Sequence, residues 1–434
     1  MKSYCLLLLL FLSPLFSQEE FDIYKLEGKI EGPTLLIFAG IHGNEPGGYF
    51  AASILTQHYT INSGNLWVVP NTNRESILKY SRGINGDLNR KFSQIERHDP
   101  DTNLIQEIKS LILEEDVSLI LNLHDGHGFF REKYTNTIFN PGAWGQTCVI
   151  DQTKLDYNSS YGDLACIAEQ VSEKLNNHLL QEHHSFNVRN TKTKKKKNEM
   201  QHSLTYFAIN NNKPAFAIET SKELKNTALK VYYQLRAIEA FMEIMGIEYQ
   251  RDFELDSENV KNITKSNGQM VINGNFSLNL DILRKNLRYI PLQSKKNDLY
   301  FTHPLGGVVE GNGFIDLYIG HKKISHLRTT PFVVQECEGP IEAIVDGSVK
   351  SVDLPSEVKI MSDIVFNAPA GYRLNVIGFT DPRYNNELGI KIARSSLLTR
   401  FSLDNEQKMF RAEFYKQDAF CGMVVLNYVA RNKE

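Results

Sequence analysis

The sequence predicts an α/β domain followed by two smaller β domains. From Pro33 to about Tyr249, short apolar runs that end in polar or glycine-containing turns alternate with apolar segments of helical length. After Arg251, short apolar runs lie between clusters of Gly and Asn. The length of 434 residues is enough for two or three domains, and the formal net charge of -3 gives no overall attraction to nucleic acid or to acidic membranes.

The first 17 residues have the pattern of a secretory signal peptide. A basic start at Lys2 precedes an apolar run over 6–12, and the small residue Ser17 closes the segment. The run is short for a bilayer span, so we expect removal of residues 1–17 and no stable membrane span afterwards. A retained N-terminal anchor is the alternative.

Removal of that segment would leave four cysteines in an oxidising compartment. The simplest pairing is one disulfide within each half of the chain. Four separate buried thiols are the alternative, because free cysteine often packs as a small hydrophobe. The four residues are Cys148, Cys166, Cys337 and Cys421.

Residues 18–250 form the predicted α/β domain. Its apolar runs of strand length cover 35–39, 66–69, 117–123 and 215–218. A helix starts near Tyr49, and further helices are expected over 104–113, 164–179 and 224–245. The lysine-rich run Lys192–Lys197 is predicted to be a solvated loop, with attraction to an anionic polymer as the alternative.

Two β domains are expected after residue 250. Residues 251–339 contain a few short strands and predict a small, barrel-like β domain. Residues 340–434 contain several strands at short spacing, which is typical of an immunoglobulin-like β-sandwich.

A His and a Glu follow the first buried strand. The run that ends at Gly40 is followed by His42 and Glu45, and the carboxyl end of a strand is where open α/β sheets bind ligands. An imidazole and a carboxylate are two of the three protein ligands that a catalytic zinc site needs. Alone, such a pair more often marks a helix start with an exposed His, so further groups are required.

Two later strand ends supply these groups. His124 follows the strand over 117–123 and is the preferred third ligand, with His127 as its rival. Glu219 follows the strand over 215–218 and is the candidate general base, although an acid at a helix start is the alternative. Asp125 is either a partner that orients an imidazole or a turn residue.

The segment 81–90 supplies cations. Arg90 with Asn89 is suited to a substrate's terminal carboxylate, since a guanidinium presents a rigid fork to it. Arg82 is placed to stabilise a developing oxyanion. Asp87 is expected to hold the loop or a neighbouring His. Solvated loop cations are the alternative for both arginines.

The ordered set of these residues resembles the zinc carboxypeptidase superfamily, which also includes the aspartoacylase and succinylglutamate desuccinylase deacylases. The resemblance covers roughly residues 30–245 and implies a mixed-sheet catalytic domain. With its two trailing β domains, the chain is similar to the cell-shape-determining D,L-carboxypeptidases of helical bacteria. By this resemblance one Zn²⁺ would be bound by His42, Glu45 and His124. Glu219 would be the base, Arg82 would polarise the carbonyl, and Asn89 with Arg90 would hold the terminal carboxylate. Tyr206 is a candidate for the tyrosine that covers the substrate in this family, with a core position as the alternative.

The resemblance implies a periplasmic enzyme that trims peptidoglycan tripeptide stems to dipeptides. It would release meso-diaminopimelate and influence cell shape, with muropeptides as substrates and cell-shape proteins as candidate partners of the β domains. One alternative is a zinc-dependent deacylase of N-acyl amino acids. Another is a non-catalytic protein that binds the cell wall.

Overall fold

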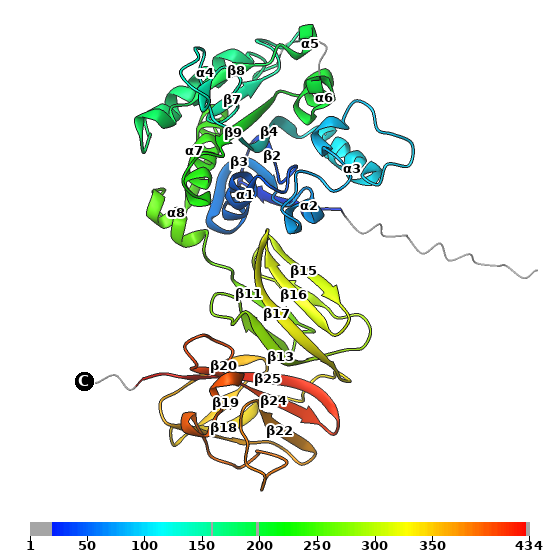
Figure 1. Ribbon diagram of the computed structural model, residues 1–434, viewed down its shortest axis with the longest axis vertical. Coiled ribbons are helices and arrows are strands. Elements are labelled where there is room, and N and C mark those ends of the chain that lie inside the picture. Colours follow the sequence, from blue (N-terminus) through cyan, green and yellow to red (C-terminus); the bar gives the residue numbers. More distant parts are fainter. Residues whose placement is uncertain (1–19, 158, 197–198, 431–434) are drawn as a thin grey trace, which may run out of the picture.

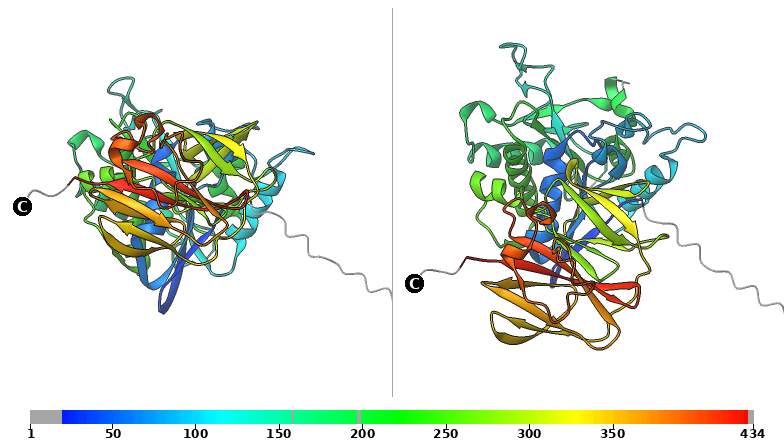
Figure 2. Two further views of the ribbon diagram at one scale, coloured as in Figure 1. Left: turned by 90° about the horizontal axis from the view of Figure 1, so that it is seen from below. Right: turned by 60° about the horizontal axis from the view of Figure 1, so that its bottom comes forward.

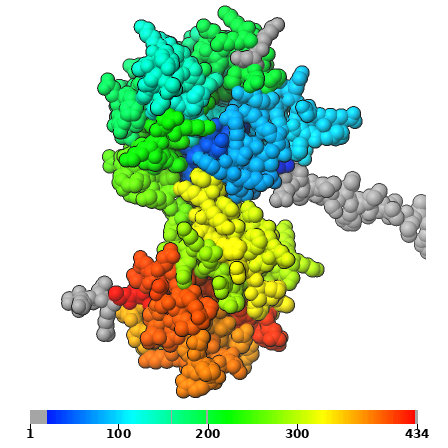
Figure 3. All heavy atoms as spheres, viewed as in Figure 1, coloured from blue at the N-terminus to red at the C-terminus, as the bar shows by residue number. Residues whose placement is uncertain are grey.

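The computed structural model describes residues 20–157, 159–196 and 199–430, so the expected signal peptide over 1–17 lies outside the described residues. The chain forms three units in sequence order along the long axis of the molecule (Figure 1). The middle unit contacts both of the others, as the space-filling view shows (Figure 3). Among the described residues, no helix is both long and apolar enough to cross a membrane.

The first unit is built on one eight-stranded mixed sheet, in the order β1-β3-β2-β4-β9-β7-β8, with β10 also paired to β3. Strands β3, β2, β4 and β9 are parallel, whereas β7 is antiparallel to β9. The carboxyl ends of β2, β4 and β9 therefore meet at one edge. The strands are β1 (Tyr24–Glu27), β2 (Ile30–Ala39), β3 (Tyr59–Val69), β4 (Val117–Gly126), β7 (Thr147–Ile150), β8 (Asn187–Asn190), β9 (Ala215–Ser221) and β10 (Glu248–Arg251).

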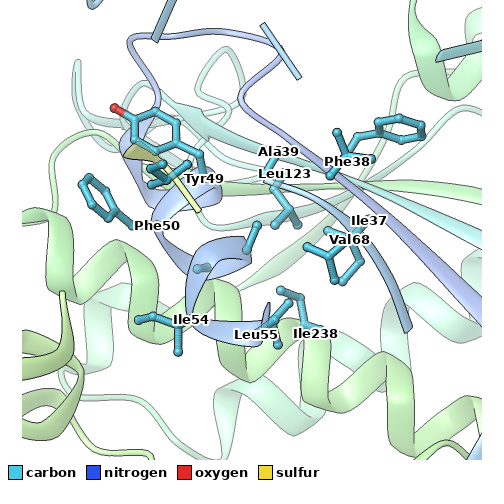
Figure 4. Close-up of a cluster of buried hydrophobic side chains, with 14 of the residues drawn as sticks. Ile37, Phe38, Ala39, Tyr49, Phe50, Ile54, Leu55, Val68, Leu123 and Ile238 are labelled. Atoms are coloured by element: carbon cyan, nitrogen blue, oxygen red, sulfur yellow. The ribbon is translucent and has the colours of Figure 1, made fainter. Parts of the chain in front are cut away.

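Helices α1 and α7 pack against each other and cover the sheet. Their apolar side chains, among them Leu55 and Ile238, meet Val68 and Leu123 of the sheet in one buried cluster (Figure 4). Gly48 lets α1 approach closely, because a Cβ there would lie 2.9 Å from Leu123. The helices are α1 (Pro46–His58), α2 (Arg74–Leu78), α3 (Thr102–Leu113), α4 (Leu164–Asn176), α5 (Thr193–Lys196), α6 (Leu204–Asn210), α7 (Thr227–Met245) and α8 (Ser257–Ile263). Shorter pieces are β5 (Phe129–Phe130), β6 (Phe139–Asn140) and the 3₁₀ turns η1 (Leu88–Arg90), η2 (Glu182–His184) and η3 (Glu199–His202).

The lysine-rich run is not a loop throughout. It contains the single-turn helix α5, whose Thr193 is buried and donates a hydrogen bond to Asp151. Lys194 and Lys195 point outward, and Lys194 pairs with Asp156 at 2.7 Å. Apolar periodicity does not predict this helical turn, because a buried threonine and not a hydrophobic residue anchors it.

The middle unit consists of two small sheets. One has the order β12-β11-β14 and the other β13-β17-β16-β15. Its core is continuous with that of the first unit, and the Tyr49 hydroxyl on α1 contacts His321 Nδ1 at 2.6 Å. The strands are β11 (Gln269–Ile272), β12 (Phe276–Asn279), β13 (Asn286–Leu292), β14 (Leu299–Phe301), β15 (Gly306–Gly311), β16 (Phe314–Ile319) and β17 (Lys322–Pro331).

The last unit is a sandwich of two four-stranded sheets, β19-β18-β21-β23 and β20-β25-β24-β22, stacked against the middle unit (Figures 1 and 2). It has its own core, in which Phe366 of one sheet meets Phe414 of the other edge to face. The predicted fold class is thus confirmed. The elements are β18 (Ile341–Val345), β19 (Ser348–Val352), β20 (Ser356–Ile360), β21 (Asp363–Asn367), β22 (Tyr372–Val376), β23 (Ile392–Ala393), η4 (Arg394–Ser396), η5 (Thr399–Phe401), β24 (Met409–Lys416) and β25 (Ala419–Tyr428).

One of the two expected disulfides is present. Cys337, which precedes the sandwich, is bonded to Cys421 on β25. The expected pairing in the first half is wrong, because Cys148 lies buried in strand β7 whereas Cys166 is exposed on α4. Burial among apolar groups raises the pKa of the Cys148 thiol, so this cysteine behaves as a core residue.

Candidate active site

The turn between β2 and α1 brings His42 and Glu45 into the interior. Glu45 is the N-cap residue of α1, with Pro46 at the first helical position. The turn is tight, since a Cβ at Gly43 would lie 2.0 Å from the backbone of Ser76. Only glycine fits there, and the close packing fixes the direction of both functional side chains.

His42, Glu45 and His124 form one buried cluster. Glu45 Oε2 lies 3.1 Å from His42 Nδ1 and 2.8 Å from His124 Nδ1. Each of the three residues is only 3% exposed, and one ligand atom from each lies within 4.8 Å of the other two. The structure therefore brings together the three residues that the sequence analysis selected as metal ligands. The rival His127 is exposed and lies outside this cluster.

The charges in the cluster suit a divalent cation. Burial would raise the pKa of Glu45, but the two imidazoles hold it well below its usual value, so the carboxylate stays ionised. Burial lowers the pKa of His124 and favours its neutral form. Two imidazole nitrogens and one carboxylate, with a cavity beside them, match the ligand set and the open position of a catalytic zinc site.

Asp87 supports His42 from behind. Its Oδ1 lies 2.8 Å from His42 Nε2, which leaves Nδ1 of that ring facing the cluster. The same carboxylate pairs with Arg82 at 2.9 Å and caps the turn η1 by accepting a hydrogen bond from the Asn89 N–H. Burial would lower the pKa of His42, but Glu45 and Asp87 together raise it. Asp87 thus performs both of the tasks expected for it, holding the loop and a histidine.

Asp125 has a different role from either one expected. It lies within β4, is buried, and accepts hydrogen bonds from the Gly47 N–H at 3.0 Å and the Thr220 hydroxyl at 2.5 Å. Its Oδ2 also lies 3.6 Å from Lys230 Nζ on α7. Asp125 therefore ties the start of α1 to β9 and α7, and so fixes Glu45.

Glu219 lies opposite His124 in the register of β4 and β9 and lines a cavity above the cluster. Burial, together with the charges of Glu45 and Asp125, raises the pKa of Glu219 well above its usual value. A carboxylate with a raised pKa accepts a proton more readily near neutral pH. Glu219 thus lies beside the cluster, as the sequence analysis expects, and its role as the base stays a prediction.

The cavity has a volume of about 220 Å³ and is rich in cations. Arg82 Nη1 and Lys222 Nζ each lie 3.2 Å from Glu45 Oε1. The Arg90 guanidinium is held over the main chain by a 3.0 Å hydrogen bond to the carbonyl of Asn89. Other lining residues are Asn89, His127, Trp144 and Met200.

Asn89 and Tyr206 were both expected to bind the substrate, but only Asn89 lines the cavity. Asn89 Oδ1 accepts a hydrogen bond from the Leu204 N–H at 2.9 Å, which docks α6 beside the cavity. Tyr206 is buried on α6 and is not among the residues that line the cavity, so the structure does not bring it into the site. The sequence analysis did not select Lys222, although its position three residues after Glu219, at the end of the same strand, could have indicated it.

Comparisons with known proteins agree with this geometry. Residues 2–265 match the model of a family described as the catalytic part of a carboxypeptidase controlling helical cell shape. Residues 334–429 match a C-terminal domain of metallo-carboxypeptidase. No match was found among curated protein sequences.

Three solved structures of the cell shape determinant protein Csd4 from Helicobacter pylori are similar over nearly the whole chain. They are an apo form, a tripeptide-bound form and a form bound to mDAP that is described as a D,L-carboxypeptidase. Each is 33% identical and covers 94% of this chain and 100% of its own. The TM-scores are 0.89, 0.88 and 0.89, respectively.

Proposed function

The chain belongs to the family of carboxypeptidases that control helical cell shape, and we propose from this premise that it is a periplasmic, zinc-dependent D,L-carboxypeptidase. Its substrate is the tripeptide stem of peptidoglycan, which it cuts to a dipeptide with release of meso-diaminopimelate. The tripeptide-bound and mDAP-bound structures of the Helicobacter pylori relative support this choice of substrate and product.

One observation carries the proposal: the cluster of His42, Glu45 and His124 lies at the floor of a cavity that also holds Glu219 and Arg90. Zinc bound to the cluster would polarise a scissile carbonyl and bring the pKa of water to about 7. A hydrolytic site needs these charges and a base in one place: three strand ends deliver the cluster and Glu219 to the same edge of the sheet, and η1 supplies Arg90.

The protein's own side chains have separate tasks. Glu219 takes a proton from the attacking water onto a carboxylate oxygen and then gives it to the leaving amine. Arg90, beside Asn89, binds the terminal carboxylate of the peptide through its guanidinium fork. Arg82 donates to the carbonyl oxygen as it gains negative charge, because its guanidinium is held in the cavity wall by Asp87.

The test is mass analysis of purified muropeptides after incubation with the protein, with and without a zinc chelator. We expect loss of one diaminopimelate from the tripeptide and no change when the chelator is present. Glu219→Gln should retain zinc and lose at least about a thousandfold in turnover, whereas the exposed Glu223→Gln should retain activity. Cleavage of N-acyl amino acids in place of the tripeptide would contradict the proposed substrate.

Zinc itself is tested by elemental analysis. His42→Ala should lose the metal, because it removes one of three ligands, whereas His178→Ala at an exposed position should not. Equal metal content in the two variants would remove His42 from the site. Another divalent metal in the wild-type protein would contradict the choice of zinc.

We further propose that residues 1–17 direct export and that 18–250, 251–339 and 340–434 are the three domains. The separate core of the sandwich supports the boundary at 340. The first two units share one continuous core, so the boundary at 250 marks the change from α/β to all-β structure and not a division between two cores. Fractionation of cells, with the wall enzyme found in the periplasm, checks the location. The β domains offer surfaces for cell-shape partners, which co-purification would identify.

A further inference from the structure

A second cavity lies at the junction of the middle unit and the sandwich. Its volume is about 440 Å³, twice that of the catalytic cavity. One wall comes from β13 and the residues just before it, and the other from β24 and the 400–403 segment. Both strands are labelled in Figure 1. Four of its lining residues are arginines and none is acidic: Arg284, Arg288, Arg400 and Arg411.

Arg411 is the most deeply buried of the four arginines that line this arginine cavity. It is 2% exposed, and its guanidinium donates to the carbonyls of Arg288 at 2.9 Å and Tyr289 at 3.4 Å. Its Nη1 also pairs with Glu413 at 3.2 Å. Among the described residues, no hydrogen-bond partner is present for its buried Nε. An unpaired charged donor at this depth costs free energy unless a ligand meets it.

Arg284 is held in place by the opposite wall. Its Nη1 donates to the carbonyls of Thr399 at 3.2 Å and Arg400 at 3.1 Å. These hydrogen bonds fix the guanidinium in position. Because the carbonyls are neutral, they do not cancel its charge, and the guanidinium remains available to an anion. Arg284 and Arg411 together therefore hold two guanidinium groups rigidly across the domain junction.

The remaining two arginines leave the cavity strongly positive. Arg288 and Arg400 are exposed, and no ion pair joins either one to a carboxylate in the part of the chain that the structure describes. Glu413 offsets only one of the four charges. Like charges around a concave wall repel one another and raise the local potential, which attracts an anionic ligand.

The rim of the arginine cavity adds an aromatic surface. Tyr289 is 53% exposed, lies 6.3 Å from the Phe401 ring, and has a φ of 60°, in the left-handed region. A tyrosine in that region costs free energy that the surrounding structure must supply, and such residues gather at binding sites. Guanidinium forks beside an exposed ring are a combination suited to a peptide that carries carboxylates.

We propose that the arginine cavity binds a second, uncut stem peptide of the wall polymer through at least two of its carboxylates. The identity of the polymer rests on the proposed function. The volume suits a few residues of peptide better than a single phosphate ion, and a recessed cavity suits a flexible peptide better than a flat membrane surface. Because the polymer repeats its stems, a second contact raises the effective concentration of the catalytic domain on it.

The test uses the full exported chain and purified sacculi in a co-sedimentation assay at 0.15 M salt. Arg288→Glu/Arg400→Glu should bind sacculi at least tenfold more weakly than the wild type. The matched variant Arg328→Glu/Lys359→Glu makes the same change in charge at exposed positions outside the cavity and should bind normally. Both variants should cleave soluble muramyl tripeptide at the wild-type rate. Arg288→Gln/Arg400→Gln repeats the test with a smaller change to the folded state.

Equal binding of sacculi by the cavity variants and the wild type overturns the inference. So does binding to phosphatidylglycerol vesicles that the cavity variants lose while sacculus binding is unchanged, since that would make a lipid headgroup the ligand. Failure of the wild type to cut the soluble tripeptide refutes the proposed function by a separate readout. Loss of sacculus binding in both pairs of variants would show a general charge effect and also overturns the inference.

Discussion

Removing the carboxylate of Asp87 should weaken metal binding, although Asp87 is not itself one of the proposed ligands. Its Oδ1 lies 2.8 Å from His42 Nε2, and its Oδ2 holds Arg82. Burial acts against ionisation, but His42 and Arg82 hold the pKa of Asp87 well below its usual value. The carboxylate is therefore charged at every working pH, and it fixes which ring nitrogen of His42 faces the cluster.

The size of the effect follows from what each substitution leaves behind. Asp87→Asn keeps an oxygen that accepts from His42 Nε2–H, but it removes the charge and replaces the oxygen that accepts from Arg82 with an NH2 group. Because the contact to His42 remains, we expect about tenfold weaker metal binding, or about 1.4 kcal/mol. Asp87→Ala leaves Nε2 without a partner on a side chain that is 2% exposed. For Asp87→Ala we expect metal binding to be about a hundredfold weaker, near the upper end of the usual range for such partners of a metal ligand.

The assay is competition for zinc between the protein and a chelator of known affinity, followed by kcat/KM on muramyl tripeptide at saturating zinc. The matched control is Asp316→Asn, which alters a similar aspartate–histidine pair in the middle unit, 2.6 Å from His326 Nδ1. It should leave zinc affinity unchanged. A zinc affinity for Asp87→Ala within twofold of the wild type would refute the reasoning about His42.

Three further predictions concern stability and packing. Cys337→Ala/Cys421→Ala opens a loop with a sequence separation of 84. It should lower the free energy of unfolding of the sandwich by about 4 kcal/mol, measured by guanidinium unfolding, and leave tripeptide cleavage unchanged. A loss below about 1 kcal/mol would contradict this. Burial lowers the pKa of His303 from 6.5 to about 4, so the unfolded chain takes up its proton first. Stability should therefore fall by about 3 kcal/mol as the pH drops from 6.5 to 4, and His303→Asn should flatten that part of the urea-unfolding profile; an unchanged slope would argue against it. Gly47→Ala would place a Cβ 2.3 Å from Asp125 Oδ1. We therefore expect a loss of about 1–3 kcal/mol in the free energy of unfolding, and weaker zinc binding in a chelator competition. Wild-type values in both measurements would show that α1 can shift freely.

Much of the fold was predictable because the buried strands and helices carry strong apolar patterns. The pattern ends the third predicted strand at residue 123, but β4 continues to Gly126, which is paired with Ser221 on β9. Apolar periodicity cannot detect this extension, because the last residues are polar and their backbone is ordered by pairing with a distant strand. Similarly, the helix expected from residue 224 starts at Thr227, after the side chain of Asn226 caps it.

The candidate site was predictable only in its chemistry-bearing residues. Strand ends select His42, Glu45, His124 and Glu219, because polar groups directly after buried strands are conspicuous in a sequence. The role of Asp125 was not predictable, since its partners on α1, β9 and α7 are all distant from it in the chain. The pairing expected for the first two cysteines failed for the same reason: a shared half of the sequence does not place two side chains in contact.

The two oxygens of Glu45 face different groups, and this division links the metal site to the substrate site. Oε2 faces both imidazoles, whereas Oε1 lies 3.2 Å from Arg82 and from Lys222. Arg82 also pairs with Asp87, so His42 and Arg82 share the same two carboxylates. A cation held by the two imidazoles and Glu45 would draw negative charge from this carboxylate and loosen its hold on Arg82 and Lys222. Because Arg82 and Lys222 line the cavity, occupancy of the metal site would then be coupled to the binding of an anionic peptide through the buried carboxylate of Glu45.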